Sequence, residues 1–103
     1  MRYGVKNWCQ FQHYKHRNPP WIKLYRDILN DPEWHNLPAD TAKVLVMLWL
    51  LACEDPYTVR GGLPDVPALA FRLRIAEEKV QQHLEILSGK WIIEIEDATD
   101  LEY

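Results

Sequence analysis

The cysteine and histidine residues near the N-terminus are of types that can serve as metal ligands. Cys9, His13 and His16 lie within eight residues of one another, and the other cysteine is Cys53. Metal sites commonly pair their ligands as C-x-x-C or H-x-x-x-H, and the sequence contains neither pair. We therefore expect no metal and no other cofactor. His13 is expected beside Tyr14 on a polar aromatic surface, and Cys53 in the core.

The residues of common catalytic sites are present, but not in catalytic patterns. Asp55, Asp65 and Asp97 form no paired-carboxylate pattern, and no serine occupies a nucleophile elbow. Gly61 and Gly62 are not followed by the residues of a phosphate-binding loop. We therefore expect no catalytic residue and a protein that is not an enzyme.

Aromatic and basic side chains alternate between residues 14 and 26. They are Tyr14, Lys15, Arg17, Trp21, Lys23, Tyr25 and Arg26. This composition is typical of surfaces that follow a phosphate backbone and stack on bases. The alternative is that Trp21 and Tyr25, four residues apart, pack against a core helix. In that case the basic residues remain available to a partner.

The charges are unevenly distributed along the chain, whose formal net charge is −3. Residues 1–30 hold six basic residues and one acidic residue, whereas residues 31–103 hold six basic and fourteen acidic residues. A surface that binds phosphates is therefore expected to draw on the N-terminal third. The alternative is that these basic residues are scattered over a solvated face.

A chain of 103 residues has room for one domain, because a single core usually organises about 100–150 residues. We divide it into a strand or arm with a basic segment (1–20), a helical core (21–96) and an acidic tail (97–103). The longest apolar run is far shorter than the roughly 20 residues that cross a membrane, and the N-terminus does not resemble a secretory signal. We expect a cytoplasmic protein with no membrane contact.

Hydrophobic periodicity predicts the elements that position these residues. A short strand is expected at residues 3–5, and an amphipathic helix at 21–29, where apolar residues recur every three or four positions. A short turn at 33–37 leads into a helix at 39–54. Because that helix has no polar face after Lys43, it is expected to lie at the centre of the core.

The segment VPALAFRLRIAEEKVQQHLEILSGKWIIEIE fits a helix-turn-helix at residues 66–88 and a strand at 91–96. Such a motif needs a small residue where its helices cross, and Ala70 occupies that position. Apolar residues at spacings of three and four line the facing surfaces; they are Leu69, Leu73, Ile75, Val80, Leu84 and Leu87. A plain helical hairpin would show the same spacings, but the strand favours the motif. The predicted fold is mainly α with a small β component, a winged helix-turn-helix.

Local details of this segment are also predicted. Arg74 occupies the turn, where a glycine often adopts an unusual backbone angle, and Ala76 replaces the usual polar cap of the second helix. His83 is expected to be partly buried beside the inner face. Ile93 and Ile95 are expected to face the core, with acidic residues between and after them.

The outward face of the second helix is not basic. It is formed by Glu78, Gln81, Gln82 and Glu85, with Lys79 at its edge. Glutamine can read adenine and glutamate can accept from cytosine, but carboxylates repel phosphates. We expect this segment alone to bind DNA weakly, with Arg72, Arg74 and Lys90 contacting the backbone beside it.

The chain resembles the N-terminal domain of phage-encoded replication proteins, the replisome-organiser and DnaD-like primosome group, over about residues 5–96. The most distinctive part is FQHYKHRNPPWIKLY at residues 11–25. The resemblance implies a module that binds origin DNA or self-associates, followed in the full protein by a region that recruits a helicase or helicase loader. It carries over no catalytic residue. Because the chain ends soon after the strand at 91–96, either the wing is incomplete or this is an excised domain.

These observations predict a DNA-binding module of a phage-type DNA replication initiation protein, for double- or single-stranded DNA. The residues expected to contact DNA are Lys15, Arg17, Lys23, Arg26, Arg72, Arg74, Lys79, Gln81, Gln82 and Lys90. The alternative is a protein-interaction or self-association module on the same scaffold, without direct DNA binding. Exposed Trp and Tyr residues would anchor its interface, and the acidic tail favours it.

Overall fold

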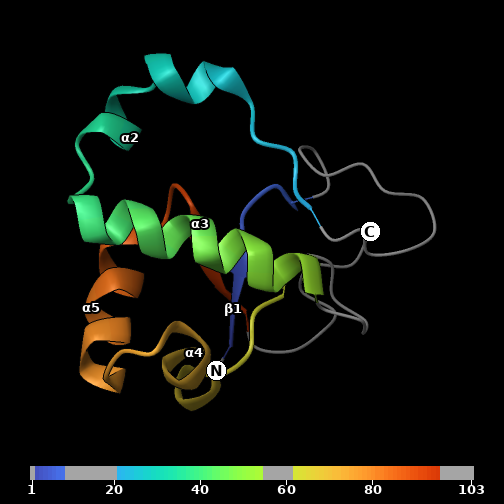
Figure 1. The fold of residues 1–103 in the computed structure, drawn as a ribbon, viewed down its shortest axis with the longest axis vertical. Coiled ribbons are helices and arrows are strands. Elements are labelled where there is room, and N and C mark those ends of the chain that lie inside the picture. The colour runs from blue at the N-terminus through green and yellow to red at the C-terminus, as the bar shows by residue number, and fades with distance from the viewer. Residues whose placement is uncertain (1, 9–20, 55–61, 96–103) are drawn as a thin grey trace.

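The computed structural model describes residues 2–8, 21–54 and 62–95 (Figure 1). The helices are η1 (Arg26–Asn30, a 3-10 helix), α2 (Pro32–His35), α3 (Ala39–Glu54), α4 (Val66–Leu73) and α5 (Glu77–Leu87). The strands are β1 (Arg2–Val5) and β2 (Ile92–Ile95), which pair in an antiparallel sheet. The prediction of a mainly α chain with a small β component is confirmed.

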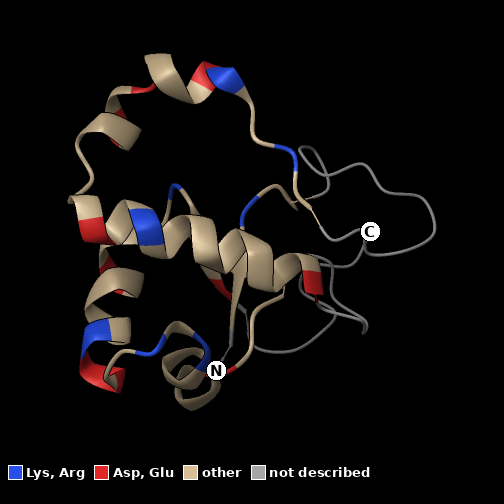
Figure 2. Ribbon diagram, viewed as in Figure 1, with Lys and Arg blue, Asp and Glu red and all other residues tan. Residues whose placement is uncertain are grey.

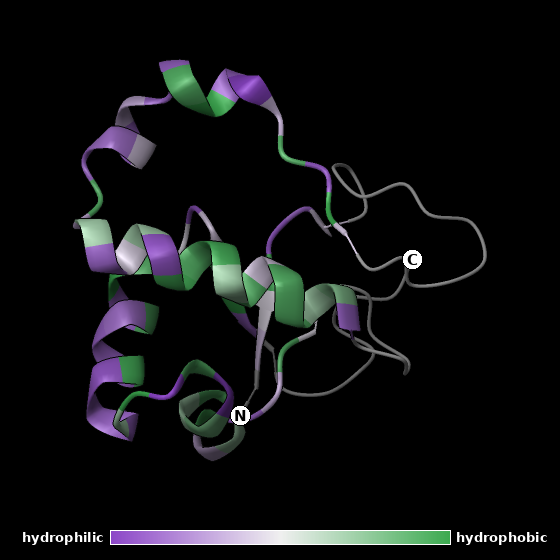
Figure 3. Cartoon of the chain, viewed as in Figure 1, coloured by the Kyte–Doolittle hydropathy of each residue, from purple (hydrophilic) through white to green (hydrophobic). Residues whose placement is uncertain are grey.

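Helix α3 crosses the middle of the described structure, with η1 and α2 on one side and α4 and α5 on the other (Figure 1). Its bounds are those predicted. Leu45 and Leu48 are fully buried, and most of the helix is apolar (Figure 3). Leu50 keeps 45% of its surface exposed, so the described residues do not cover α3 on every side.

The core joins α3 to α5 through a polar contact as well as through apolar packing. Thr41 of α3 and His83 of α5 are both buried, and Thr41 Oγ1 lies 2.9 Å from His83 Nδ1. Because each partner satisfies the other, neither buried polar side chain is left without a hydrogen bond. The sequence predicts His83 to be partly buried beside the inner face of α5; it is one of the buried residues of that helix.

The predicted turn between α4 and α5 is confirmed, and it has the unusual backbone angle. Arg74 adopts the left-handed conformation, with φ 61° and ψ 42°, and its amide donates to the Ala70 carbonyl at 2.9 Å. Ala76 begins α5 without a side-chain cap. The buried faces of both helices follow the predicted spacing, with Leu69 and Leu73 on α4. On α5 they are Val80, His83, Leu84 and Leu87.

Strand β1 lies between β2 and Gly62, because Gly4 pairs with Ile93 on one side and bridges to Gly62 on the other. The sheet therefore joins the beginning of the chain to the strand that follows α5. The predicted orientation of β2 is wrong by one residue. Ile92 is fully buried opposite Val5, whereas Ile93 is only partly buried. Since neighbouring side chains point to opposite faces, pairing Ile92 with Val5 decides which face of β2 meets the core. The side chain of Ile95 lies outside the described part.

The predicted amphipathic helix at residues 21–29 is also wrong. Residues 21–25 have no regular structure, and only the 3-10 helix η1 follows. The Trp21 carbonyl accepts a hydrogen bond from the Cys53 thiol at 3.5 Å, and Ile22 packs against the core. A helix of nine residues has only marginal stability unless it packs on another surface. Here the segment is instead held by contacts of individual residues. Trp21 and Tyr25 accordingly remain 52% and 43% exposed.

Candidate functional site

The exposed face of α5 carries the side chains that the sequence placed there. They are Glu78, Lys79, Gln81, Gln82 and Glu85, and Glu77 at the first position of the helix is exposed as well. Acidic and basic residues lie together at the start of the helix (Figure 2). The face is therefore sterically open to a partner, but its net charge is negative.

Arg74 and Lys79 are the basic residues closest in sequence to the start of this face. Both are exposed, and neither forms an ion pair with any residue that the structure describes. Arg74 occupies a left-handed backbone position, which costs a residue other than glycine about 1–2 kcal/mol. Its side chain projects from the turn between two packed helices, so the packing of these helices fixes the backbone position of Arg74.

Arg72 is held by an acidic residue of α3. Its two terminal nitrogens donate to Glu54 Oε1 at 2.7 Å and to Oε2 at 2.9 Å, a two-point pairing. The hydrogen bond from Arg72 lowers the pKa of Glu54 and raises the pKa of Arg72. To bind a phosphate, Arg72 would have to weaken or break its ion pair with Glu54.

Lys90, which follows the end of α5, also forms ion pairs with carboxylates. Its Nζ lies 3.1 Å from Asp31 Oδ2 and 3.8 Å from Glu33 Oε1, and 5.2 Å from the centre of the Trp91 ring. Burial raises the pKa of Asp31, but hydrogen bonds from Lys90 and from the Glu33 amide outweigh it and lower the pKa. Two carboxylates thus offset the charge of Lys90.

The remaining predicted contacts come from the N-terminal third. Lys15 and Arg17 lie outside the described residues. Lys23 is partly buried and Arg26 is exposed on η1, on the opposite side of α3 from α5 (Figure 2). The structure therefore does not bring all the predicted residues into one surface. Those it describes divide between the η1 side and the α4–α5 side of α3.

Three tryptophans form a cluster between these two sides. Trp34 stacks on Trp49 with ring centres 6.3 Å apart, and Trp91 meets both rings edge-on at 6.3 and 6.2 Å. Such aromatic pairs stabilise a fold beyond the area that they bury. The cluster joins α2, α3 and the start of β2, although its members are far apart in sequence.

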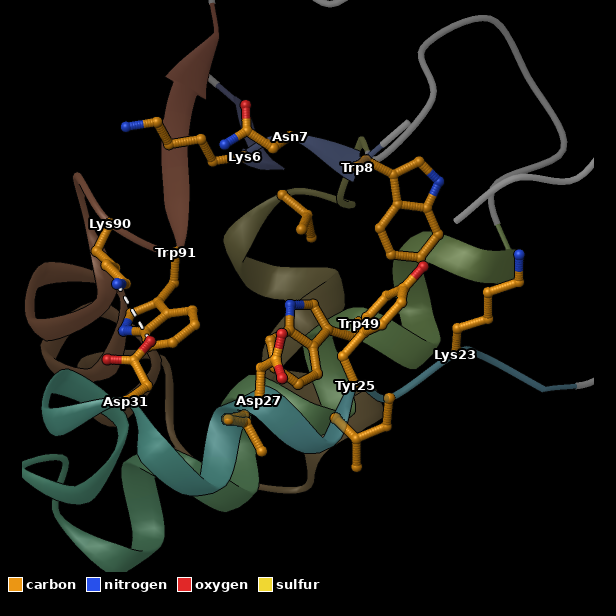
Figure 4. Close-up of a pocket in the computed structure, with 13 residues that line it drawn as sticks. Lys6, Asn7, Trp8, Lys23, Tyr25, Asp27, Asp31, Trp49, Lys90 and Trp91 are labelled. Carbon is orange, nitrogen blue, oxygen red and sulfur yellow. Dashed lines mark ion pairs between the residues drawn. The ribbon is translucent and has the colours of Figure 1, made fainter. Parts of the chain in front are cut away.

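A cleft of about 630 Å³ opens beside this cluster (Figure 4). Four aromatic side chains line it: Trp8, Tyr25, Trp49 and Trp91. Its charged lining residues are Lys6, Lys23, Asp27, Asp31 and Lys90. The sequence indicated Lys23, Tyr25 and Lys90 as candidate contact residues, but not the other three rings, for which its only signal is the high tryptophan count, five in 103 residues.

Two further findings concern metal-binding groups and membrane-spanning helices in the described part of the chain. Among the described residues, no group of three or more His, Cys, Asp or Glu side chains could hold a metal ion. Cys9, His13 and His16 lie outside those residues. Cys53 is buried, and burial raises the pKa of its thiol. None of the described helices combines the length and the apolar composition needed to cross a membrane.

Comparison with protein-family models, with curated proteins and with solved structures found no match to this chain.

Proposed function

We propose that this chain is a DNA-binding module of a phage-type DNA replication initiation protein, built on a winged helix-turn-helix and acting in the cytoplasm. In this proposal α4, the turn at residues 74–76 and α5 form the helix-turn-helix. Strand β2 is the first wing strand, and β1 supplies its antiparallel partner. The resemblance of residues 11–25 to phage replication proteins supports the assignment to replication.

The position of Arg74 is the observation that carries the proposal. A left-handed turn is most easily made by glycine, and strained backbone positions occur preferentially at functional sites. Here the residue is an exposed arginine without an ion-pair partner in the described chain. A guanidinium at this turn can bind a phosphate with two parallel hydrogen bonds, just where α5 would approach a duplex.

The acidic residues of α5 determine what kind of binding follows. Glu78 and Glu85 repel phosphates, so the few unpaired cations at the start of α5 must supply the attraction. Gln81 and Gln82 are exposed and have the chemistry to read adenine. We therefore expect weak, salt-sensitive binding to duplex DNA, with backbone contacts dominating.

Replacing Arg74 by glycine is expected to separate DNA binding from folding. Loss of one phosphate contact lowers duplex affinity about 15-fold at about 0.05 M salt and reduces the salt slope by about one unit. Removing the left-handed strain, partly offset by the greater freedom of glycine in the unfolded chain, raises the free energy of unfolding by about 0.5–1 kcal/mol. Fluorescence anisotropy with a labelled duplex, and chemical denaturation, measure the two effects.

Lys43→Ala is the matched control, because it removes one exposed positive charge from α3 rather than from the turn. It should change duplex affinity by less than about threefold. The proposal is wrong if the unmodified chain does not bind duplex DNA at low salt. It is also wrong if Arg74→Gly and Lys43→Ala weaken binding equally.

A second candidate function, protein interaction or self-association without DNA binding, is favoured by one observation. Phe71 on α4 is 81% exposed, and Leu50 and Ile86 are about half exposed on neighbouring helices. Large exposed apolar side chains commonly mark contact surfaces. Sedimentation velocity tests self-association. In that case the average mass should rise with protein concentration, and Arg74→Gly should not change this rise. A monomer throughout the micromolar range would contradict self-association.

A further inference from the structure

We propose that the aromatic cleft beside Trp49 binds an unpaired base of single-stranded DNA. The proposal rests on the DNA-binding function above, and it locates a second DNA contact on the opposite side of α3 from the turn at Arg74. Figure 4 shows the rings of Trp8, Tyr25, Trp49 and Trp91 around one hollow. Lys23 lies at one end of that hollow and the Lys90–Asp31 ion pair at the other (Figure 4).

The walls of the cleft are held in place before any ligand binds. Trp8 is 93% buried, and the rings of Trp49 and Trp91 are fixed against each other and against Trp34. Tyr25 differs, because 43% of its surface is exposed and it belongs to a segment without regular structure. A base can therefore stack on Tyr25 without disturbing the tryptophan cluster.

The size and shape of the cleft favour one base over a base pair. Its volume of about 630 Å³ lies within the usual range for small-ligand sites, which are mostly apolar with a few polar groups. A base in a duplex is stacked on both faces and cannot enter such a hollow unless it is extruded. An unpaired base presents both faces and its polar edge.

The charged residues of the cleft match the other parts of a nucleotide. Lys6 lines the cleft, and its ammonium donates one hydrogen bond to the Gly89 carbonyl at 3.0 Å, which leaves further donors. With Lys23 it can attract the phosphates on either side of the base. Asp31 is occupied by Lys90, which leaves Asp27 as the carboxylate able to accept from an N–H on the base edge. An uncharged apolar peptide would use none of these groups.

Tyr25→Ala tests this proposal in the full chain. The probe is a labelled single strand of about 12 deoxythymidines, compared with a labelled duplex by fluorescence anisotropy at low salt. Loss of one stacking partner is expected to weaken single-strand binding about tenfold and to leave duplex binding unchanged. Tyr25→Phe keeps the ring and should retain affinity to within about twofold.

Trp21→Ala is the matched control. Trp21 is an exposed aromatic residue of the same segment, and it does not line the cleft. Its replacement should leave single-strand binding within about twofold. The thermal transition of each variant shows that folding is retained.

Each of the following results would overturn the proposal. The first is a single-strand affinity that Tyr25→Ala leaves unchanged. The second is duplex binding without any single-strand binding, which spares the function assigned to Arg74 and refutes only the cleft. The third is a change in sedimentation with Tyr25→Ala at constant single-strand affinity, which would mean that a protein segment occupies the cleft. Failure of both nucleic acids to bind refutes the DNA-binding function itself.

Discussion

Replacing Arg74 by glycine and Lys79 by alanine together is expected to lower duplex DNA affinity on the order of 200-fold at about 0.05 M salt. Each phosphate contact contributes a slope of about −0.9 to the dependence of log affinity on log salt. Extending this slope from about 1 M to about 0.05 M salt gives about 15-fold per contact. Both residues are exposed, and neither is paired with a described carboxylate, so both charges are available to phosphates.

The measurement is a salt titration of anisotropy with labelled duplex, in which the slope should fall by about two units. The pair of replacements Glu78→Gln and Glu85→Gln removes negative instead of positive charge from α5. Removing each outward carboxylate should strengthen binding about twofold at this salt concentration, because unpaired surface charges interact weakly through water. Asp27→Asn removes a carboxylate from η1, on the other side of α3, and should leave duplex affinity unchanged.

The experiment is decisive because the two sets of replacements are expected to change duplex affinity in opposite directions. If the glutamine variants weaken duplex binding while the double variant retains it, the carboxylates of α5 read bases and the cations at its start are dispensable. If neither pair of replacements changes affinity, α5 does not face DNA. Either result rejects the docking geometry proposed here.

Deleting residues 2–5, and with them strand β1, is expected to abolish cooperative folding. Val5 is buried in the core, and burying such a side chain contributes about 1.5–3 kcal/mol. The deletion also removes the hydrogen bonds that β1 forms with β2 and the one that the Leu63 amide donates to the Tyr3 carbonyl. Each unsatisfied buried group costs about 1–3 kcal/mol. The total exceeds about 5 kcal/mol, which is all the stability that many small domains have.

Circular dichroism during thermal unfolding measures this prediction, since the truncated chain should lose its sharp transition. Tyr3→Phe is the control within the same strand. It removes only the hydrogen bond from the Tyr3 hydroxyl to Glu94, which is 3.3 Å long and exposed, and should cost less than about 0.5 kcal/mol. A truncated chain that unfolds cooperatively near the original temperature would show that β2 does not depend on β1.

Local sequence patterns determined the helices that bury a continuous apolar face. The bounds of α3, the turn at Arg74 and the buried face of α5 all follow from spacings of three and four residues and from local turn chemistry. These signals lie within a few residues of the structure that they specify, so they can be read without knowing the rest of the fold. The same logic failed at residues 21–29, where the pattern was helical but too little described surface covers the apolar side chains.

The tertiary structure alone decided which charges are available and where the aromatic rings gather. Arg72 and Lys90 appear in the sequence as cations equal to Arg74, yet carboxylates of α3 and of the η1–α2 region bind them. Spacing along the chain cannot show this, because the partners are 18 or more residues apart and meet only when the helices pack. The tryptophan cluster and the cleft have the same origin. The cluster joins α2, α3 and the residue before β2, and the cleft also includes Val5 of the N-terminal strand. Sequence periodicity specifies which face of an element is buried; tertiary packing specifies what that face, and the charges beside it, finally contact.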